Sequence, residues 1–324
     1  MRKLVIILVL AFFAMNCGFL LVNYRPDVPP ERLNEEYADG RSRFVAVDGA
    51  NVHLRDEGEA RAGTPPLVLI HGTAASLHTW EGWVRELSHD LRLIRFDLPG
   101  FGLTGPNEDH DYRISRYART LDALLDALGV GRVDVAGNSL GGYVAWVYAL
   151  ERPQRVRRLI LIDAAGYASD VPGAKPTTLD AGRVPLLRSL LRKVTPRSLV
   201  RSGLLEVYAD DSKVTPALVE RYYRLLLRAG NRDALIARLS TPWEDREGEI
   251  PSIRQPTLIQ WGGQDRWIPP AVGERFHADL PHSELLIYDD LGHVPMEEDP
   301  VRTARDARAF LLRPEPAAES SNDP

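Results

Sequence analysis

Cysteine is nearly absent from this sequence. Its 324 residues include only one, Cys17, so no disulfide can form within the chain. A chain without an internal disulfide can fold in an oxidising or a reducing compartment, so the cysteine content does not decide its location.

Long runs of positive charge are also absent. The net charge is −5, and no sustained block of Lys and Arg occurs. Because phosphate backbones are bound by concentrated basic surfaces, we predict no nucleic acid partner. The patterns CxxC and HExxH, a Walker loop and a GxGxxG after a strand are missing as well, so we predict no metal and no nucleotide cofactor.

A long apolar run is present near the N-terminus, from Leu4 to Val22. As a helix it would be about 28 Å long, close to the ~30 Å hydrocarbon core of a bilayer. Arg2 and Lys3 precede it, which favours a cytoplasmic N-terminus. We therefore predict a membrane anchor over residues 1–23, with the rest of the chain in the periplasm or otherwise outside the cytoplasm. A cleaved signal sequence is the alternative, although no pair of small residues marks a cleavage site at the end of the run.

Apolar runs alternate with helical patterns through most of the remaining chain. This alternation predicts an α/β fold with a mostly parallel central sheet and helices on both faces. Arg92 and Arg95 indicate that one of the strands lies nearer the edge of the sheet. The expected strands cover residues 44–47, 52–55, 67–70, 91–96, 133–136, 156–162, 256–261 and 285–288.

Helical stripes of leucine replace the strand pattern in the third quarter of the chain, which predicts a helical cap inserted into the sheet domain. The segment after the apolar run is rich in proline and charge and predicts a tether. The predicted parts are a tether at 24–42, a first core part at 43–165, the cap at 166–250, a second core part at 251–313 and a disordered tail at 314–324. The oligomeric state stays open.

A nucleophile is predicted at Ser139, in the stretch Val133 to Tyr143. A β-branched strand, the turn Gly-Asn-Ser-Leu-Gly and a helical segment follow one another without a spacer. Such a turn holds the serine in a strained conformation at the end of the strand, and glycines stand where a Cβ would collide with the backbone. The N–H of Leu140 opens the helix without an intrahelical acceptor, so it points toward negative charge that develops beside the serine.

A serine hydroxyl is a poor nucleophile near neutral pH and needs a base, which in turn needs an orienting acid. His293 comes directly after the last expected strand, where a loop could place its ring over the serine. Asp265 also follows a strand, 126 residues after Ser139 and 28 before His293. Asp163, at the end of strand 156–162, is the alternative acid and ranks second.

The chain resembles the α/β-hydrolase family, in its branch of capped serine esterases and related hydrolases. The resemblance covers residues 43 to about 312 and implies the α/β-hydrolase fold with a helical cap. It also implies the order Ser139, Asp265, His293 for a catalytic triad, and an oxyanion hole made by the N–H groups of Thr73 and Leu140. The motifs that carry it are HGT at 71–73, DLPGFG at 97–102, GNSLGG at 137–142, GGQD at 262–265 and GH at 292–293.

We therefore predict a serine hydrolase that cleaves a small-molecule carboxylic ester or acyl substrate through an acyl-enzyme. One alternative is a carbon–carbon bond hydrolase of ring-cleavage products, a branch that usually has tryptophan after the histidine, whereas here Val294 follows His293. Another alternative is a catalytically silent, membrane-tethered binding protein, against which the intact set of three residues argues. The sequence does not fix the physiological substrate.

Overall fold

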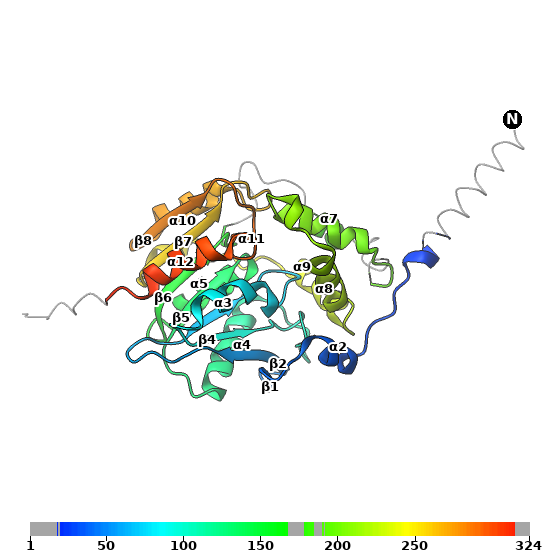
Figure 1. Ribbon diagram of the computed structural model, residues 1–324, viewed down its shortest axis with the longest axis horizontal. Coiled ribbons are helices and arrows are strands. Elements are labelled where there is room, and N and C mark those ends of the chain that lie inside the picture. Colours follow the sequence, from blue (N-terminus) through cyan, green and yellow to red (C-terminus); the bar gives the residue numbers. More distant parts are fainter. Residues whose placement is uncertain (1–17, 19, 168–177, 185–189, 191, 315–324) are drawn as a thin grey trace, which may run out of the picture.

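The computed structural model describes residues 18, 20–167, 178–184, 190 and 192–314 (Figure 1). Eight strands form one sheet in the order β1-β2-β4-β3-β5-β6-β7-β8. β2 pairs antiparallel with β1 and β4, and every other pairing is parallel. The strands are β1 Ser42–Val47, β2 Ala50–Glu57, β3 Leu67–Ile70, β4 Leu93–Phe96, β5 Val133–Asn138, β6 Val156–Ile162, β7 Thr257–Gly262 and β8 Ser283–Tyr288.

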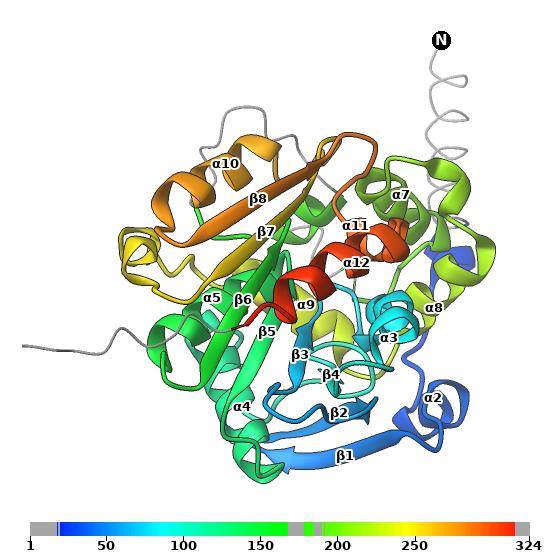
Figure 2. The ribbon, with the colours of Figure 1, turned by 60° about the vertical axis from the view of Figure 1, so that its left-hand side comes forward.

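Helices cover both faces of this sheet, with α4, α5 and α10 on one face and α3 and α12 on the other (Figure 2). β3, β5, β6 and β7 are buried along their whole length because both of their faces are covered. The predicted fold class is confirmed. The core helices are α3 Glu81–Leu87, α4 Ile114–Ala127, α5 Leu140–Glu151, α10 Pro270–Asp279, α11 Pro295–Glu298 and α12 Pro300–Leu311.

A helical segment connects β6 to β7 and lies against the loops that follow β3, β5 and β8 (Figure 1). Among the described residues its helices are α7 Arg197–Val207, α8 Pro216–Leu226 and α9 Asn231–Ser240, with the short 3-10 helices η2 Thr178–Arg183, η3 Asp211–Lys213 and η4 Glu247–Ser252. Proline at the first turn and the Thr215 side chain, which accepts from the Leu218 N–H at 3.2 Å, begin α8. The exact boundaries of the cap and of the other predicted parts stay a prediction, and residues 315–324 of the expected tail lie outside the described residues.

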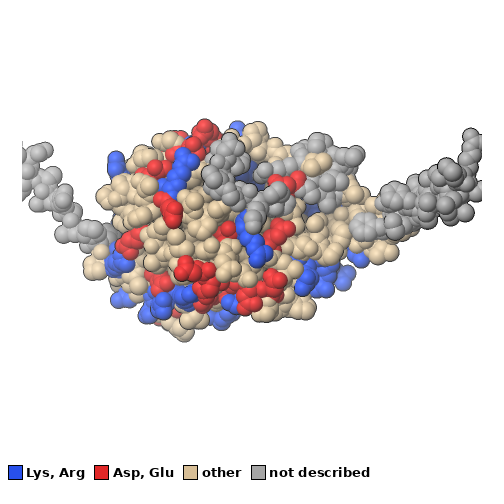
Figure 3. Space-filling view, turned by 90° about the horizontal axis from the view of Figure 1, so that it is seen from above, with Lys and Arg blue, Asp and Glu red and all other residues tan. Residues whose placement is uncertain are grey.

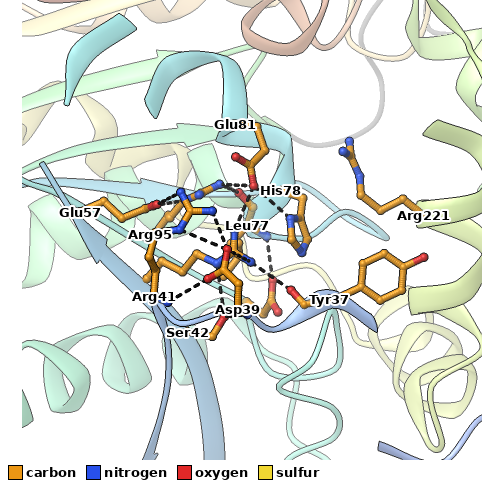
Figure 4. A network of polar contacts seen from close by, with 12 residues as sticks. Tyr37, Asp39, Arg41, Ser42, Glu57, Leu77, His78, Glu81, Arg95 and Arg221 are labelled. Carbon is orange, nitrogen blue, oxygen red and sulfur yellow. Dashed lines mark hydrogen bonds and ion pairs between the residues drawn. The ribbon is translucent and has the colours of Figure 1, made fainter. Parts of the chain in front are cut away.

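β4 lies between β2 and β3, so it is one position nearer the β1 edge than β3, but it is an interior strand of the sheet. Arg95 is fully buried because acidic side chains neutralise it: its Nε donates to Glu57 at 2.7 Å, and Nη1 lies 3.0 Å from Glu81 (Figure 4). Nη1 also donates to the Leu77 carbonyl at 3.1 Å. A buried arginine that is paired in this way is compatible with a central strand.

Part of the segment predicted as a tether is helical. Residues 30–37 form α2 Pro30–Tyr37, whose Leu33 is fully buried. The Tyr37 carbonyl accepts from Arg55 Nη2 at 3.0 Å, which joins this helix to β2. Proline and charge indicated a tether, whereas in the structure Leu33 and Val28 are buried against the folded domain.

The predicted membrane anchor falls mainly on residues 1–17 and 19, which lie outside the described residues. In the part of the chain that the structure describes, no helix has the length and apolar character needed to cross a membrane. The described end of the apolar run, residues 18 and 20–23, is too short for this. The predicted localisation, membrane-anchored with an extracytoplasmic catalytic domain, is therefore wrong on this finding, and the finding gives no support to the predicted membrane partner.

Charged side chains of both signs mix on the surface. On the face shown in Figure 3, Lys and Arg side chains lie among Asp and Glu side chains. Over the described surface many charged side chains pair, as Arg197 does with Glu220 at 3.0 Å and Arg192 with Asp233 at 3.1 Å. Exposed pairs of this kind add little stability, typically below about 1 kcal/mol each.

Candidate active site

Ser139 stands between β5 and α5 in a strained conformation, with φ 54° and ψ −117°. The turn is this tight because two glycines allow backbones to approach. A Cβ on Gly137 would lie 2.1 Å from the Gly141 carbonyl oxygen, and one on Gly141 would lie 2.2 Å from the Ile70 carbonyl oxygen. Positive φ in a serine is costly and clusters at functional sites. The local geometry is therefore that expected of a presented nucleophile.

His293 and Asp265 are brought together from two loops. The His293 Nδ1 lies 2.7 Å from Asp265 Oδ2, and the imidazole is nearly buried. The other carboxylate oxygen of Asp265 accepts from the N–H groups of Trp267 at 2.7 Å and Ile268 at 3.0 Å. The His293 Nε2 has no hydrogen-bond partner. With Nδ1–H donated to the carboxylate, Nε2 carries the lone pair and can accept a proton.

Ser139 and His293 line one cavity, whose volume is about 160 Å³. Thr73 lines it as well, and Leu140 begins α5 beside it. The structure therefore places all five predicted site residues at or next to one cavity; their roles stay predictions. The remaining wall is mostly aliphatic and comes from the cap, with Leu199, Val200, Leu204, Val207, Leu226, Leu235, Ile236 and Leu239.

Asp163, the alternative acid, is fully buried with φ 42° at the end of β6. Its Oδ1 accepts from the Gly262 N–H at 2.9 Å, whereas Oδ2 has no partner. Burial, and then the negative charge of Asp265, raise the pKa of Asp163 well above the usual carboxyl value. Asp265 lies 2.7 Å from the His293 Nδ1, and the raised pKa makes the charged form of Asp163 less favourable, so Asp265 is the better candidate for the orienting acid.

The same three residues are the only group of His, Cys, Asp and Glu side chains within the described ranges that has metal-site spacing. Ligand atoms of Asp163, Asp265 and His293 all lie within 4.8 Å of one another. One ring nitrogen of His293, Nδ1, is already engaged by Asp265 at 2.7 Å. Cluster geometry alone therefore gives no reason to place a metal here.

His71 and Asp97 hold loops through hydrogen bonds to the backbone. The His71 Nδ1 donates to the Gly72 carbonyl at 2.7 Å, and Nε2 accepts from the Leu98 N–H at 2.9 Å. Burial lowers the pKa of His71. Asp97 accepts from the N–H groups of Leu77 and Leu103 at 2.7 and 2.8 Å. Both side chains therefore shape the backbone that borders the pocket.

Two positioning residues were not found from the sequence. Asn138 Nδ2 donates to the His293 carbonyl at 3.0 Å and to the Ile162 carbonyl at 3.1 Å, which ties the serine turn to the histidine loop. Glu298 accepts from the N–H groups of Gly292 and Asp210, each at 2.8 Å. The position of Asn138 inside the serine turn was visible in the sequence, but the partners of Glu298 depend on how the cap packs.

Comparison with known proteins supplies independent findings. Residues 65–300 match the family described as alpha/beta hydrolase fold. A 2-hydroxy-6-oxononadienedioate/2-hydroxy-6-oxononatrienedioate hydrolase of Cupriavidus pinatubonensis is 32% identical, over 78% of this chain and 89% of its own. A 2-hydroxy-6-oxo-2,4-heptadienoate hydrolase of Pseudomonas putida is 33% identical, over 78% of this chain and 89% of its own.

A solved structure of a membrane phospholipase A, described as a bacterial virulence factor, is similar over almost the whole length. It is 30% identical to this chain with a TM-score of 0.71, and the match covers 96% of this chain and 98% of that one.

Proposed function

The chain belongs to the α/β-hydrolase family and is a hydrolase, and from this premise we propose that it cleaves carboxylic esters through an acyl-enzyme formed on Ser139. Ser139 Oγ attacks the ester carbonyl carbon while His293 Nε2 takes its proton. Asp265 holds the Nδ1–H and stabilises the imidazolium that forms. The N–H groups of Thr73 and Leu140 bind the oxyanion of the tetrahedral intermediate.

The intermediate collapses when the carbon–oxygen bond to the alcohol breaks and the alcohol leaves with the proton held by His293. A water molecule then attacks the acyl carbon, gives a proton to His293 and releases the carboxylic acid, with Ser139 restored. Removing one oxyanion donor from such a site costs about a hundredfold or more in turnover.

The apolar lining of the pocket is the observation that carries the proposal. Among the described lining residues the only Lys or Arg side chain is Arg232, and it already lies 2.5 Å from the carboxylate of Asp27. An uncharged acyl chain gains free energy from such aliphatic walls, at about 0.8 kcal/mol per buried methylene. A substrate that carries carboxylates finds no unpaired cation among these residues.

Carbon–carbon bond hydrolysis is the second candidate, and the curated relatives favour it over ester cleavage. Both relatives above are named as hydrolases of oxo-dienoic acids, the substrate class of the ring-cleavage alternative. The phospholipase A structure, whose name is that of an ester hydrolase, favours the first candidate. Val294 also favours ester cleavage, because the carbon–carbon bond hydrolases usually have tryptophan directly after the histidine.

One experiment separates the two candidates. The purified chain and its Ser139→Ala variant are given 4-nitrophenyl butyrate and octanoate and, separately, 2-hydroxy-6-oxohepta-2,4-dienoate. We expect ester turnover that the Ser139→Ala variant lacks, together with covalent labelling of Ser139 by a fluorophosphonate. Turnover of the dienoate without turnover of the esters would replace the first candidate with the second.

A further inference from the structure

The segment that precedes α2 forms a strap across the cap, defined here as residues 24–29. It runs past the start of α7 and the junction of α8 and α9 (Figures 1 and 2). The Arg25 N–H donates to the Lys193 carbonyl at 2.9 Å, and the Val28 N–H donates to the Leu227 carbonyl at 2.8 Å. The Val28 carbonyl accepts from the Ala229 N–H at 2.9 Å. Backbone hydrogen bonds on both sides of Asp27 therefore fix its position on the cap.

Asp27 reaches from this strap to Arg232, the second residue of α9. Arg232 Nη2 lies 2.5 Å from Asp27 Oδ1 and donates to the Arg25 carbonyl at 2.8 Å. Nη1 donates to the Thr195 hydroxyl at 3.2 Å. The Arg232 side chain is only 4% exposed, and its Nε is buried without a partner. The strap thus supplies the carboxylate that compensates a nearly buried cation.

Arg232 lines the same cavity as Ser139, whereas Asp27 is not among the described lining residues. The charge of Arg232, which lines the pocket, is therefore balanced by Asp27, which lies outside the pocket lining and 205 positions earlier in the chain. Asp27 is partly exposed and has a second cation, Lys193, 3.8 Å from its other oxygen, but Arg232 itself is nearly buried. A carboxylate that entered the cavity would therefore have to compete with Asp27 for a guanidinium whose charge is already balanced. Burying a carboxylate without a compensating charge is costly.

We propose that Asp27 sets the charge selectivity of the acyl pocket: by neutralising Arg232, it makes the pocket accept uncharged acyl chains and reject acyl groups that end in a carboxylate. This inference rests on the proposed function, because it concerns the acyl group that Ser139 would receive. Removing the charge of Asp27 leaves Arg232 with an uncompensated guanidinium and a free Nε–H, which together suit a carboxylate.

The test uses two fluorophosphonates with chains of equal length, one ending in a methyl group and one in a carboxylate. The second-order rate of Ser139 labelling is measured in the wild type, in Asp27→Asn and in Asp233→Asn. The last is a matched control, because Asp233 adjoins Arg232 but pairs with Arg192 at 3.1 Å on the surface. We expect Asp27→Asn to shift the rate ratio toward the carboxylate probe by about tenfold, the equivalent of 1.4 kcal/mol, and Asp233→Asn to leave it unchanged.

A variant that removes the positive charge of the pair instead of the negative one gives a second, independent test. Arg232→Gln removes the closer of the two cations that face Asp27 and leaves Lys193, 3.8 Å away, as its partner, so the rate ratio should move further toward the uncharged probe. An unchanged ratio in a folded Asp27→Asn variant, an equal shift in Asp233→Asn, or a shift of both Asp27→Asn and Arg232→Gln in one direction would overturn the proposal. If Asp27→Asn does not fold, the direction of the Arg232→Gln shift decides.

Failure of the ester proposal is recognised separately. Calorimetric binding of octanol and of 8-hydroxyoctanoate needs no nucleophile, and we expect the same change in selectivity between these two ligands. A chain that shows this change but does not turn over esters would refute ester cleavage and retain the role of Asp27.

Discussion

Asp163 and Asp265 present two buried carboxyl groups to one site, and only Asp265 contacts the histidine. Asp265 Oδ2 lies 2.7 Å from His293 Nδ1, whereas Asp163 Oδ2 has no partner. The two carboxyl groups differ in the number of backbone N–H groups that donate to them. Asp265 accepts two N–H groups, from Trp267 and Ile268, and Asp163 accepts one, from Gly262. Hydrogen bonds to a carboxylate favour its charged form, so Asp265 is the better site for the negative charge.

We expect Asp265→Asn to lower kcat by about 10³- to 10⁴-fold, since the amide stabilises the wrong imidazole tautomer and carries no charge. Asp163→Asn should stay within about tenfold of the wild type, because an amide resembles a neutral carboxyl group in shape. Initial rates with a 4-nitrophenyl ester measure both variants, and circular dichroism checks that each is folded. If Asp163→Asn is the more damaged of the two, the acid role belongs to Asp163.

A pH dependence of stability follows from the raised pKa of Asp163. Below the pKa of an unfolded carboxyl group, near 3.8, both states carry the proton. As the pH rises, the unfolded state releases its proton first, so the free energy of unfolding falls until the folded-state pKa is passed. The Asp163→Asn variant cannot lose this proton. Urea denaturation at about pH 5 and pH 8 should therefore show the variant gaining stability relative to the wild type at the higher pH; a constant difference would mean that Asp163 is ionised in the folded chain.

Local motifs made the serine turn and the histidine and aspartate loops predictable, because each is a short stretch whose chemistry depends on its own residues. The burial of Arg95 was not predictable in this way. Arg92 and Arg95 indicated only that the strand lies nearer the edge of the sheet, and the partners Glu57 and Glu81, which neutralise Arg95 in the interior, come from other elements. The strap was missed for the same physical reason, since the contact of Asp27 with Arg232 exists only after the cap has packed.

Glu298 should act as a positioning residue for the histidine loop. Its buried carboxylate accepts from the Gly292 N–H, next to His293, and from the Ala209 and Asp210 N–H groups of the cap. Glu298→Gln replaces an acceptor oxygen with a donor, so at least one of these N–H groups loses its partner. We expect a loss of about 1–3 kcal/mol in the free energy of unfolding.

The same variant should lower kcat more than it raises KM, because the loop that carries His293 loosens while the acyl pocket remains. Glu284→Gln is the matched control, since Glu284 lies on the surface and pairs with the exposed Arg313. Equal effects of the two changes would mean that Glu298 contributes only charge.

Val200 on α7 offers a test of the acyl pocket through substrate length. It lines the cavity, whereas the next residue, Arg201, is exposed on the same helix. Val200→Trp should fill part of a space of about 160 Å³ and leave less room for the distal methylenes of a chain. Each methylene that can no longer be buried forfeits about 0.8 kcal/mol, or roughly fourfold in kcat/KM. We therefore expect the ratio of kcat/KM for 4-nitrophenyl octanoate over butyrate to fall by about tenfold or more, while Arg201→Trp leaves it unchanged. An unaltered ratio in Val200→Trp would mean that the acyl chain does not run along α7 and that the aliphatic wall serves only to pack the cap.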